Sequence, residues 1–180
     1  MESQRIIPAI SNHKRLKEFL NSDLIYGLLM NFHLAQLADI VQQMKEKGKK
    51  VLVHSELIKG LASDEYGAIY LIQVLNVDGI ISSKARVIDI CKKRNKIGIY
   101  RFFVNDNVSL EQSLDIGVNL KPDYVEIIPA ACYGLIPEIK EKLQAKVLMG
   151  GLIRTETDIL NCLNNGAVAV TTSNKDFWHK

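Results

Sequence analysis

Short runs rich in isoleucine, valine and tyrosine recur along the chain, and polar stretches separate them. The runs show little alternation of apolar and polar residues, which is typical of parallel strands covered on both faces. Each run therefore predicts one strand of a buried parallel sheet. The predicted strands are residues 5–10, 24–28, 50–53, 78–82, 98–103, 123–127, 146–149 and 167–171.

The stretches between these runs have the period of helices, because apolar residues recur every three or four positions. Gly48 and Gly166 stand where a helix is expected to end before a strand. Thr155, with Asp158 three positions later, predicts the N-terminal cap of a further helix. The apolar faces of two helices are predicted to contain Leu34, Leu37, Ala38, Val41 and Met44, and Ile136, Ile139 and Leu143.

Strand and helix patterns alternate about eight times, which allows either a closed barrel or an open doubly wound sheet. The count of strands, and the glycine motifs near the C-terminus, favour an α/β fold of the compact (β/α)8 TIM-barrel type. We expect one such domain over residues 1–180. Since this fold usually needs roughly 200 residues, the last helix is expected to be short or missing.

Composition excludes few classes of protein. Hydrophobic residues make up 47% of the chain and charged residues 24%, as in ordinary globular proteins. The net charge of +3 is too weak to argue for a nucleic-acid partner by itself. Three cysteines without a CxxC pair favour reduced thiols over a disulfide framework or a zinc site. With no visible signal peptide or membrane-spanning run, we expect a cytoplasmic protein without a membrane partner, metal or cofactor.

Two glycine- and hydroxyl-rich motifs follow the last two predicted strands. They are MGGLI, which contains Gly150 and Gly151, and VTTSN, which contains Thr172 and Ser173. Barrel proteins often hold phosphate after their seventh and eighth strands. Glycines let backbone N–H groups approach an anion, and a short helix expected near Ser173 would direct its positive end there. The motifs therefore predict a phosphate site, although the glycine pair could also serve only as a tight turn.

Polar side chains at earlier strand ends are candidates for the rest of a ligand. His54, Glu56, Arg101 and Glu126 stand at or just past the ends of three predicted strands, where barrel sites gather. Two carboxylates and an arginine could perform acid–base chemistry or hold the hydroxyl groups of a polyol. They could equally form a buried ion pair that fixes the strands. No residue is assigned as catalytic.

Two basic runs precede predicted strands, which places them at the opposite, N-terminal face of the barrel. They could complement the dipoles of helix C-termini, or they could contact the phosphates of a nucleic acid. Neither run contains aromatic residues for base stacking. The residues concerned include the RNA-binding candidates Lys47, Lys49, Lys50, Lys92, Lys93 and Arg94.

At these motifs the sequence resembles the glycerol uptake operon antiterminator regulatory protein family. The resemblance implies a barrel that binds glycerol 3-phosphate or a similar small phosphate ester. It also implies transcription antitermination on the leader mRNA of glycerol-metabolism genes. The resemblance runs nearly end to end and is carried by IIPAI (6–10), KKVLVHSELIKGL (49–61), DGIISSK (78–84), PDYVEIIPA (122–130), GGLI (150–153) and NGAVAVTTSN (165–174).

The sequence departs from the family pattern near the expected polyol end of the ligand. Glu56 stands where the family usually has aspartate, and Ala130 stands where it usually has glycine. The alternatives to a ligand-sensing regulator are a barrel enzyme acting on a small phosphate ester and a barrel that serves only as an interaction module. Because an incomplete eighth unit would expose an apolar edge, a homo-oligomer is a further expectation.

Overall fold

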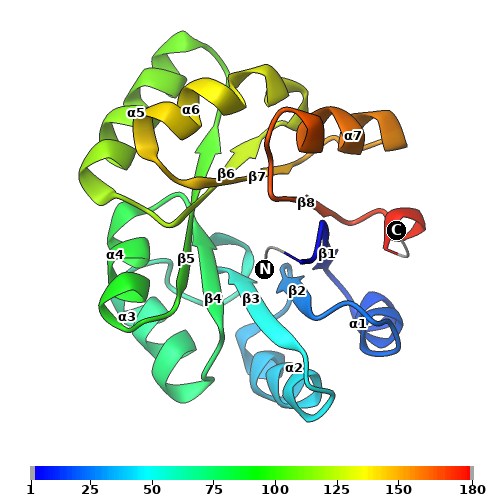
Figure 1. The fold of residues 1–180 in the computed structure, drawn as a ribbon. Coiled ribbons are helices and arrows are strands. Elements are labelled where there is room, and N and C mark those ends of the chain that lie inside the picture. Colours follow the sequence, from blue (N-terminus) through cyan, green and yellow to red (C-terminus); the bar gives the residue numbers. More distant parts are fainter. Residues whose placement is uncertain (1–2, 179–180) are drawn as a thin grey trace.

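The computed structural model describes residues 3–178, whose eight parallel strands close into a barrel (Figure 1). Each strand pairs with the next in sequence, and the last pairs with the first. Ile6 lies opposite Val170 across that closure. The predicted TIM-type barrel is confirmed. The strands are β1 (Ile6–Ile10), β2 (Tyr26–Leu29), β3 (Lys50–His54), β4 (Gly79–Ser82), β5 (Ile97–Phe103), β6 (Tyr124–Ile128), β7 (Lys146–Gly150) and β8 (Ala169–Thr172).

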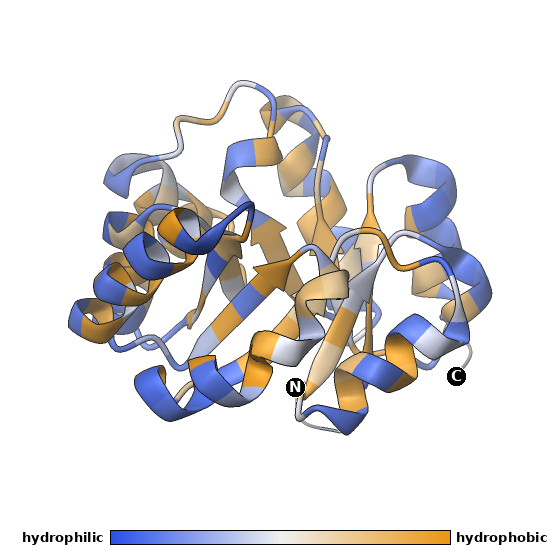
Figure 2. Ribbon diagram, turned by 90° about the horizontal axis from the view of Figure 1, so that it is seen from above, coloured by the Kyte–Doolittle hydropathy of each residue, from blue (hydrophilic) through white to orange (hydrophobic). Residues whose placement is uncertain are grey.

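Helices surround the barrel and turn their polar faces outward (Figure 2). Short helical turns accompany them at several strand ends. The helices are α1 (His13–Leu20), α2 (Leu34–Glu46), α3 (Glu65–Ile69), α4 (Ala85–Lys93), α5 (Asn107–Leu120), α6 (Ile136–Leu143) and α7 (Glu156–Asn164). The turns are η1 (Ser55–Leu57), η2 (Tyr70–Val74, a π-helical turn), η3 (Ala130–Leu135) and η4 (Lys175–Phe177).

Both predicted helix faces pack inward, with one exception. Leu37, Val41 and Met44 of α2 are buried, whereas Ala38 is exposed and Ile40 takes its place in the core. The 3.6-residue period allows Ile40 to share the buried stripe with Leu37 and Met44. In α6 the apolar residues Ile136, Ile139 and Leu143 are all buried, as predicted.

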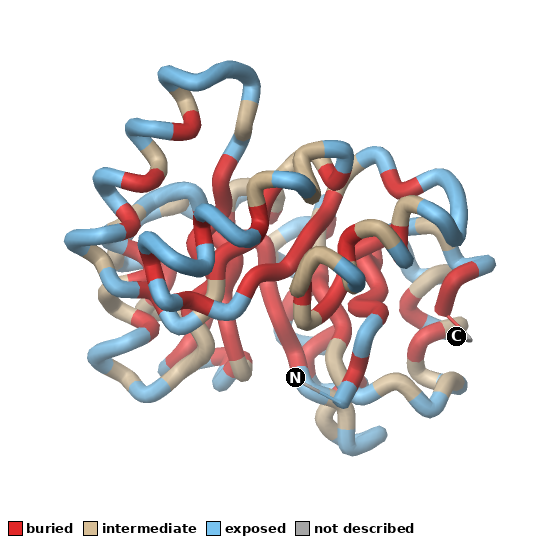
Figure 3. Tube along the Cα trace, turned by 45° about the horizontal axis from the view of Figure 1, so that its top comes forward, coloured by how far each residue is buried: buried red, intermediate tan, exposed pale blue. Residues whose placement is uncertain are grey.

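Buried residues run along the central strands (Figure 3), and they form a core of two parts that the strands separate. The larger part lies between the strands and the helices. The smaller part fills the inside of the barrel, where alternate residues of each strand meet. It consists of Ile7, Leu28, Leu52, Ile81, Ile99, Leu148 and Ala169.

The helix boundaries follow the predicted signals. Gly48 and Gly166 have φ angles of +69° and +102°, a conformation that L-residues rarely adopt. Thr155 caps α7, and Asp158 completes a capping box by accepting the backbone N–H of Thr155. The two glycines end α2 and α7 before the next strand begins, because left-handed residues cannot continue an α-helix, whereas the capping box starts α7.

The C-terminal segment differs from the prediction in one respect. The helix expected near Ser173 is only η4, a three-residue turn that begins at Lys175 and is capped by the Asn174 side chain. The last helix is thus short, as expected, but it supplies no helix dipole at Ser173. The ends of the predicted domain, residues 1–2 and 179–180, lie outside the described residues. None of the helices described combines the length and apolarity that a membrane crossing requires.

Candidate ligand-binding site at the barrel mouth

The inside of the barrel changes from apolar to polar towards the carboxyl ends of the strands. Side chains two positions apart on a strand face the same way. His54 therefore follows Leu52 on the interior face of β3, and Arg101 follows Ile99 on β5. Thr171 follows Ala169 in the same way. The alternation of each strand thus places a polar layer directly above the apolar one, at the mouth.

Arg101 is the centre of this polar layer. Its Nε donates to Glu126 Oε2 at 2.6 Å, and Nη2 lies 2.5 Å from the same oxygen. Nη1 donates to His54 Nε2. Thr171 Oγ1 donates to the other carboxylate oxygen of Glu126 at 2.5 Å. Because Glu126 is fully buried and Arg101 is 9% exposed, the pair forms a desolvated ion pair held by four strands.

His54 connects this pair to Glu56. Arginine has no acceptor, so the bond from Arg101 makes Nε2 of His54 the accepting nitrogen and leaves the proton on Nδ1. His54 Nδ1 lies 3.3 Å from Glu56 Oε2 without forming a good hydrogen bond. The imidazole of His54 therefore lies between the guanidinium of Arg101 and the carboxylate of Glu56, where it can position both side chains.

Glu56 is held as a carboxylate by the loop after β4. Its Oε1 accepts hydrogen bonds from Ser82 Oγ at 2.8 Å and from the Ser83 backbone N–H at 2.7 Å. Burial acts to raise the pKa of Glu56, but these bonds and the contact with His54 outweigh it. The pKa of Glu56 consequently lies well below its ordinary value.

A cavity of about 390 Å³ opens above the polar layer. Arg101 lies in its wall, next to the turn that follows β7 and the segment that follows β8. It is lined by Ala9, Leu28, Met30, Arg101, Ile128, Gly151, Leu152, Ile153, Arg154, Thr171, Thr172 and Ser173. Of the predicted phosphate residues, Gly151, Thr172 and Ser173 therefore border the cavity, and Arg101 is the only predicted polyol residue that does.

The turn after β7 has an unusual backbone. Gly151 has φ +72° and Leu152 has φ +57°, so two consecutive residues are left-handed. A leucine in this region costs about 1–2 kcal/mol, and its side chain is 66% exposed. Local strain of this kind gathers at ligand clamps and active sites. Here the two left-handed residues, Gly151 and Leu152, turn the main chain along the wall of the cavity.

Gly150 has a packing role at the end of β7. A Cβ atom there would collide with Thr171 Oγ1 and come within 2.8 Å of Glu126 Oε1. The absence of a side chain at Gly150 leaves the room in which these two groups meet. The residue was predicted as a phosphate ligand, but it does not line the cavity.

Sequence reasoning overlooked several residues of this site. Thr171 belongs to the VTTSN motif, yet its hydrogen bond to Glu126 depends on the register of β8 against β7. Ser82 and Ser83 become visible as partners of Glu56 only when β3 and β4 lie side by side. Among residues 3–178 no cluster of three or more histidine, cysteine or acidic side chains is arranged to hold a metal ion.

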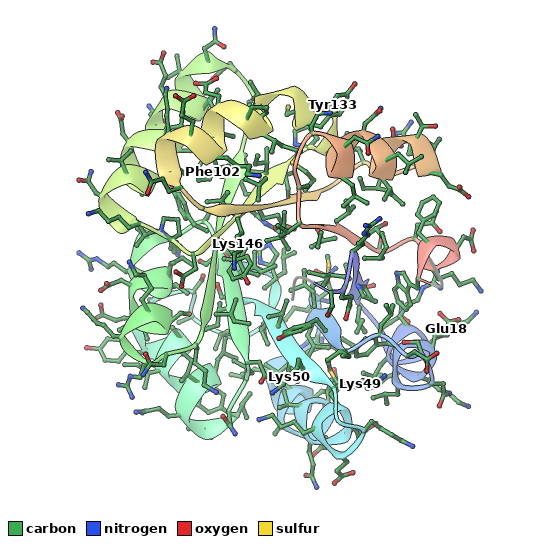
Figure 4. All side chains as sticks on the ribbon, in the orientation of Figure 1. Glu18, Lys49, Lys50, Phe102, Tyr133 and Lys146 are labelled. Carbon is green, nitrogen blue, oxygen red and sulfur yellow. The ribbon has the colours of Figure 1, made fainter. Side chains whose placement is uncertain are left out.

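The predicted RNA-binding residues lie at the opposite end of the barrel. Lys49 and Lys50 stand at the start of β3 (Figure 4). Lys92, Lys93 and Arg94 stand at the C-terminal end of α4. Lys49 Nζ donates to the carbonyl groups of Ser22 and Leu24 at 2.5 and 2.8 Å, and Lys50 pairs with Asp78 at 3.1 Å.

The second run is engaged in a similar way. Lys92 Nζ donates to the carbonyl groups of Leu120 and Lys121 at the end of α5, and Lys93 pairs with Asp89 at 2.7 Å. Within the described part of the chain, Lys47 and Arg94 have no side-chain partner. Much of the basic charge thus serves helix ends and ion pairs, and these two residues remain available.

Comparisons with known proteins agree with this architecture. Residues 6–178 match the family model of the glycerol-3-phosphate responsive antiterminator. The glycerol uptake operon antiterminator regulatory protein of Listeria monocytogenes is 35% identical, with a TM-score of 0.93 over 97% of this chain and 95% of that one. A related protein of Thermotoga maritima is 24% identical, with a TM-score of 0.83 over 98% and 99% of the two chains, and shows the fold.

The uncharacterised protein YgcP of Escherichia coli K12 is 27% identical to this chain, over 96% of this chain and 91% of its own length. Several aldolases and decarboxylases also match, at 11–17% identity, and this likeness shows the shared fold alone. Because the family model covers nearly the whole chain, the protein belongs to the glycerol-3-phosphate responsive antiterminator family.

Proposed function

We propose that the barrel mouth binds glycerol 3-phosphate. Backbone N–H groups of the left-handed turn at Gly151 and Leu152 would receive the phosphate, together with the hydroxyls of Thr172 and Ser173. The single observation that carries this assignment is the cavity of about 390 Å³ that joins this turn to Arg101. The family to which the chain belongs supports the choice of ligand.

Arg101 would hold the glycerol end. Its guanidinium carries five N–H donors, of which Glu126 and His54 engage three. The remaining donors can reach hydroxyl oxygens in the cavity. Glu126 and His54, which are buried behind Arg101, would position it rather than touch the ligand. Glu56, which accepts from Ser82, would support His54 in turn.

The bound ligand would control transcription antitermination on the leader mRNA of glycerol-metabolism genes. Ligand binding can shift a protein between two states only by its difference in affinity for them. The RNA would contact the N-terminal face through its available cations, Lys47 and Arg94. A cavity of about 740 Å³ on the same face is bordered by Lys121 and Lys142, which would add to its positive charge.

The mouth would act as a sensor rather than as a catalyst. Among the described residues, those that line the cavity include no lysine that could form a Schiff base with a phosphosugar. The buried carboxylate of Glu126 is fully engaged by Arg101 and Thr171. Turnover of a phosphosugar by the purified protein, lost on Glu126→Gln, would instead support the enzyme alternative.

The ligand is tested by thermal unfolding with glycerol 3-phosphate, glycerol and inorganic phosphate. A ligand that binds only the folded state stabilises it by roughly 2.7 kcal/mol at one hundred times its dissociation constant. We expect glycerol 3-phosphate to raise the melting temperature more than glycerol and phosphate do together. No shift with any of the three would contradict the proposal.

Variants then locate the site. Gly151→Asp places a carboxylate in the proposed phosphate position and should abolish the shift. Gly48→Asp is the matched control, because Gly48 is also left-handed but lies at the far end of the barrel with no atom near its Cβ position. Equal loss of the shift in both variants would show that strain, rather than the phosphate contact, is responsible.

A further inference from the structure

The ring of helices is interrupted between α7 and α1 (Figure 1). After β8 the described chain forms only η4, and Trp178 then folds back onto the strand. Trp178 is 2% exposed, and its indole N–H donates to the carbonyl of Thr172 at 3.1 Å. One turn and one indole therefore cover a sector that a full helix covers elsewhere.

The sector that lacks a full helix contains an apolar groove. It measures about 180 Å³ and lies where α7 passes the start of β1. A single exposed leucine needs no explanation, but Leu160 is 54% exposed and stands directly at the edge of this groove. The groove is lined by Arg5, Ile6, Glu156, Ile159, Leu160 and Leu163.

A separate depression of about 510 Å³ lies beside Trp178, between η4 and α1. Glu18 of α1 borders it (Figure 4) and lies 3.9 Å from Lys175 of η4. The apolar groove and this depression share no lining residue, and a stable protein interface, which buries at least about 1,200 Å² in total, would have to span both.

The groove carries opposite charges at its two ends. Arg5 precedes β1 at the N-terminal face, whereas Glu156 begins α7 on the side of the mouth. Both side chains are exposed. A two-fold axis across the groove would bring the basic end of one copy to the acidic end of the other. The charge pattern is therefore self-complementary, as an isologous interface requires.

We infer that this groove is the interface of a two-fold symmetric dimer of the chain. Leu160 of each copy enters the apolar groove of the other, and Arg5 of each copy faces Glu156 of its partner. Two antiterminator chains of known structure are matched over 95% and 99% of their lengths, which leaves little sequence in them for an eighth helix. A second copy is thus the occupant that the groove favours.

Sedimentation equilibrium on the whole protein tests the inference. We expect a dimer for the unmodified chain and at least a tenfold weaker association for Leu160→Glu. Ile116→Glu on α5 is the control, because Ile116 is 44% exposed and lies on a distant helix. Circular dichroism establishes that both variants fold. A monomeric unmodified chain, or equal association of all three proteins, would overturn the inference.

A mixing experiment distinguishes contacts between copies from contacts within one. Arg5→Glu makes the groove acidic at both ends, and Glu156→Arg makes it basic at both ends. Each variant alone should associate weakly, whereas an equimolar mixture should form a heterodimer in which both charge pairs are restored. Mixed variants that associate no better than either one alone would contradict the proposed pairing.

Discussion

Arg101 and Glu126 lie directly opposite each other on β5 and β6, and their side chains meet inside the barrel at 2.6 Å. Removing one member of a buried ion pair leaves the other charge without compensation, at a cost of about 3–5 kcal/mol. We expect Glu126→Gln to lower the free energy of unfolding by about 3 kcal/mol. Urea denaturation measures the change.

A double-mutant cycle is the control for this prediction. Arg101→Leu combined with Glu126→Leu removes both charges, so its cost should be smaller than the sum of the two single variants. Strict additivity would show that the pair contributes no coupling energy, contrary to the observed geometry.

Gly150 is expected to tolerate no side chain. In Gly150→Ala the new methyl group would meet Thr171 Oγ1 and Glu126 Oε1, so Arg101 would lose its fixed position. The affinity for glycerol 3-phosphate should fall at least tenfold, as measured by calorimetry. Gly134→Ala is the matched control, because no atom lies within 4 Å of the Cβ position there. An equal effect of both changes would contradict the packing role of Gly150.

The lowered pKa of Glu56 predicts a pH-dependent contribution to stability. A carboxyl group with a lowered folded-state pKa stabilises fully above its unfolded value, near 4.5, and loses that contribution as the pH falls towards the folded value. Glu56→Gln should therefore cost about 2 kcal/mol at pH 7, from lost charged hydrogen bonds. The difference from the unmodified protein should narrow below pH 4.5. A constant difference from pH 7 to pH 3 would contradict this reasoning.

The contribution of the N-terminal face to RNA binding can be tested at its two available cations. Reversing the charge of Lys47 and Arg94 should weaken leader RNA binding and reduce the slope of log affinity against log salt by about one for each lost phosphate contact. Filter binding at several salt concentrations measures both effects. Lys59→Glu, on the side of the mouth, is the control. Unchanged RNA binding in the double variant would remove this face from the proposal.

The cysteines should differ in reactivity. Burial raises the pKa of Cys91 to about 12 and that of Cys162 to about 11. Cys132 is only half-buried. Because the thiolate is the reactive form, Ellman's reagent at pH 8 should modify one thiol of the native protein quickly and the other two only after unfolding. Cys132→Ser should remove the fast phase.

Hydrophobic patterning was sufficient to predict the eight strands, whereas their closure was predicted from the count of strands and the glycine motifs near the C-terminus. Left-handed glycines and a capping box then placed several helix ends correctly. Small errors arose at helix-to-strand turns. Ala167, for instance, was placed in the last strand, but its N–H donates to the carbonyl of Cys162, so β8 begins two residues later.

The candidate site was predictable only in part. The strand ends identified Arg101 and Glu126 as neighbours of the mouth, but burial decides that only Arg101 reaches the cavity. The role of Gly150 depends on atoms of β6 and β8, which the local sequence does not reveal. The basic runs were ambiguous because the same lysines serve helix ends and phosphates equally well, until Lys49 is seen to donate to the carbonyl of Ser22.

The closure between β1 and β8 restricts how any partner can be recognised. Every strand has a neighbour on both sides, so no row of unpaired main-chain groups is left for a partner strand to extend the sheet. Recognition of RNA, or of a second copy, must therefore use helix surfaces and loops. Substitutions on those surfaces can change the choice of partner while the barrel beneath them keeps its fold.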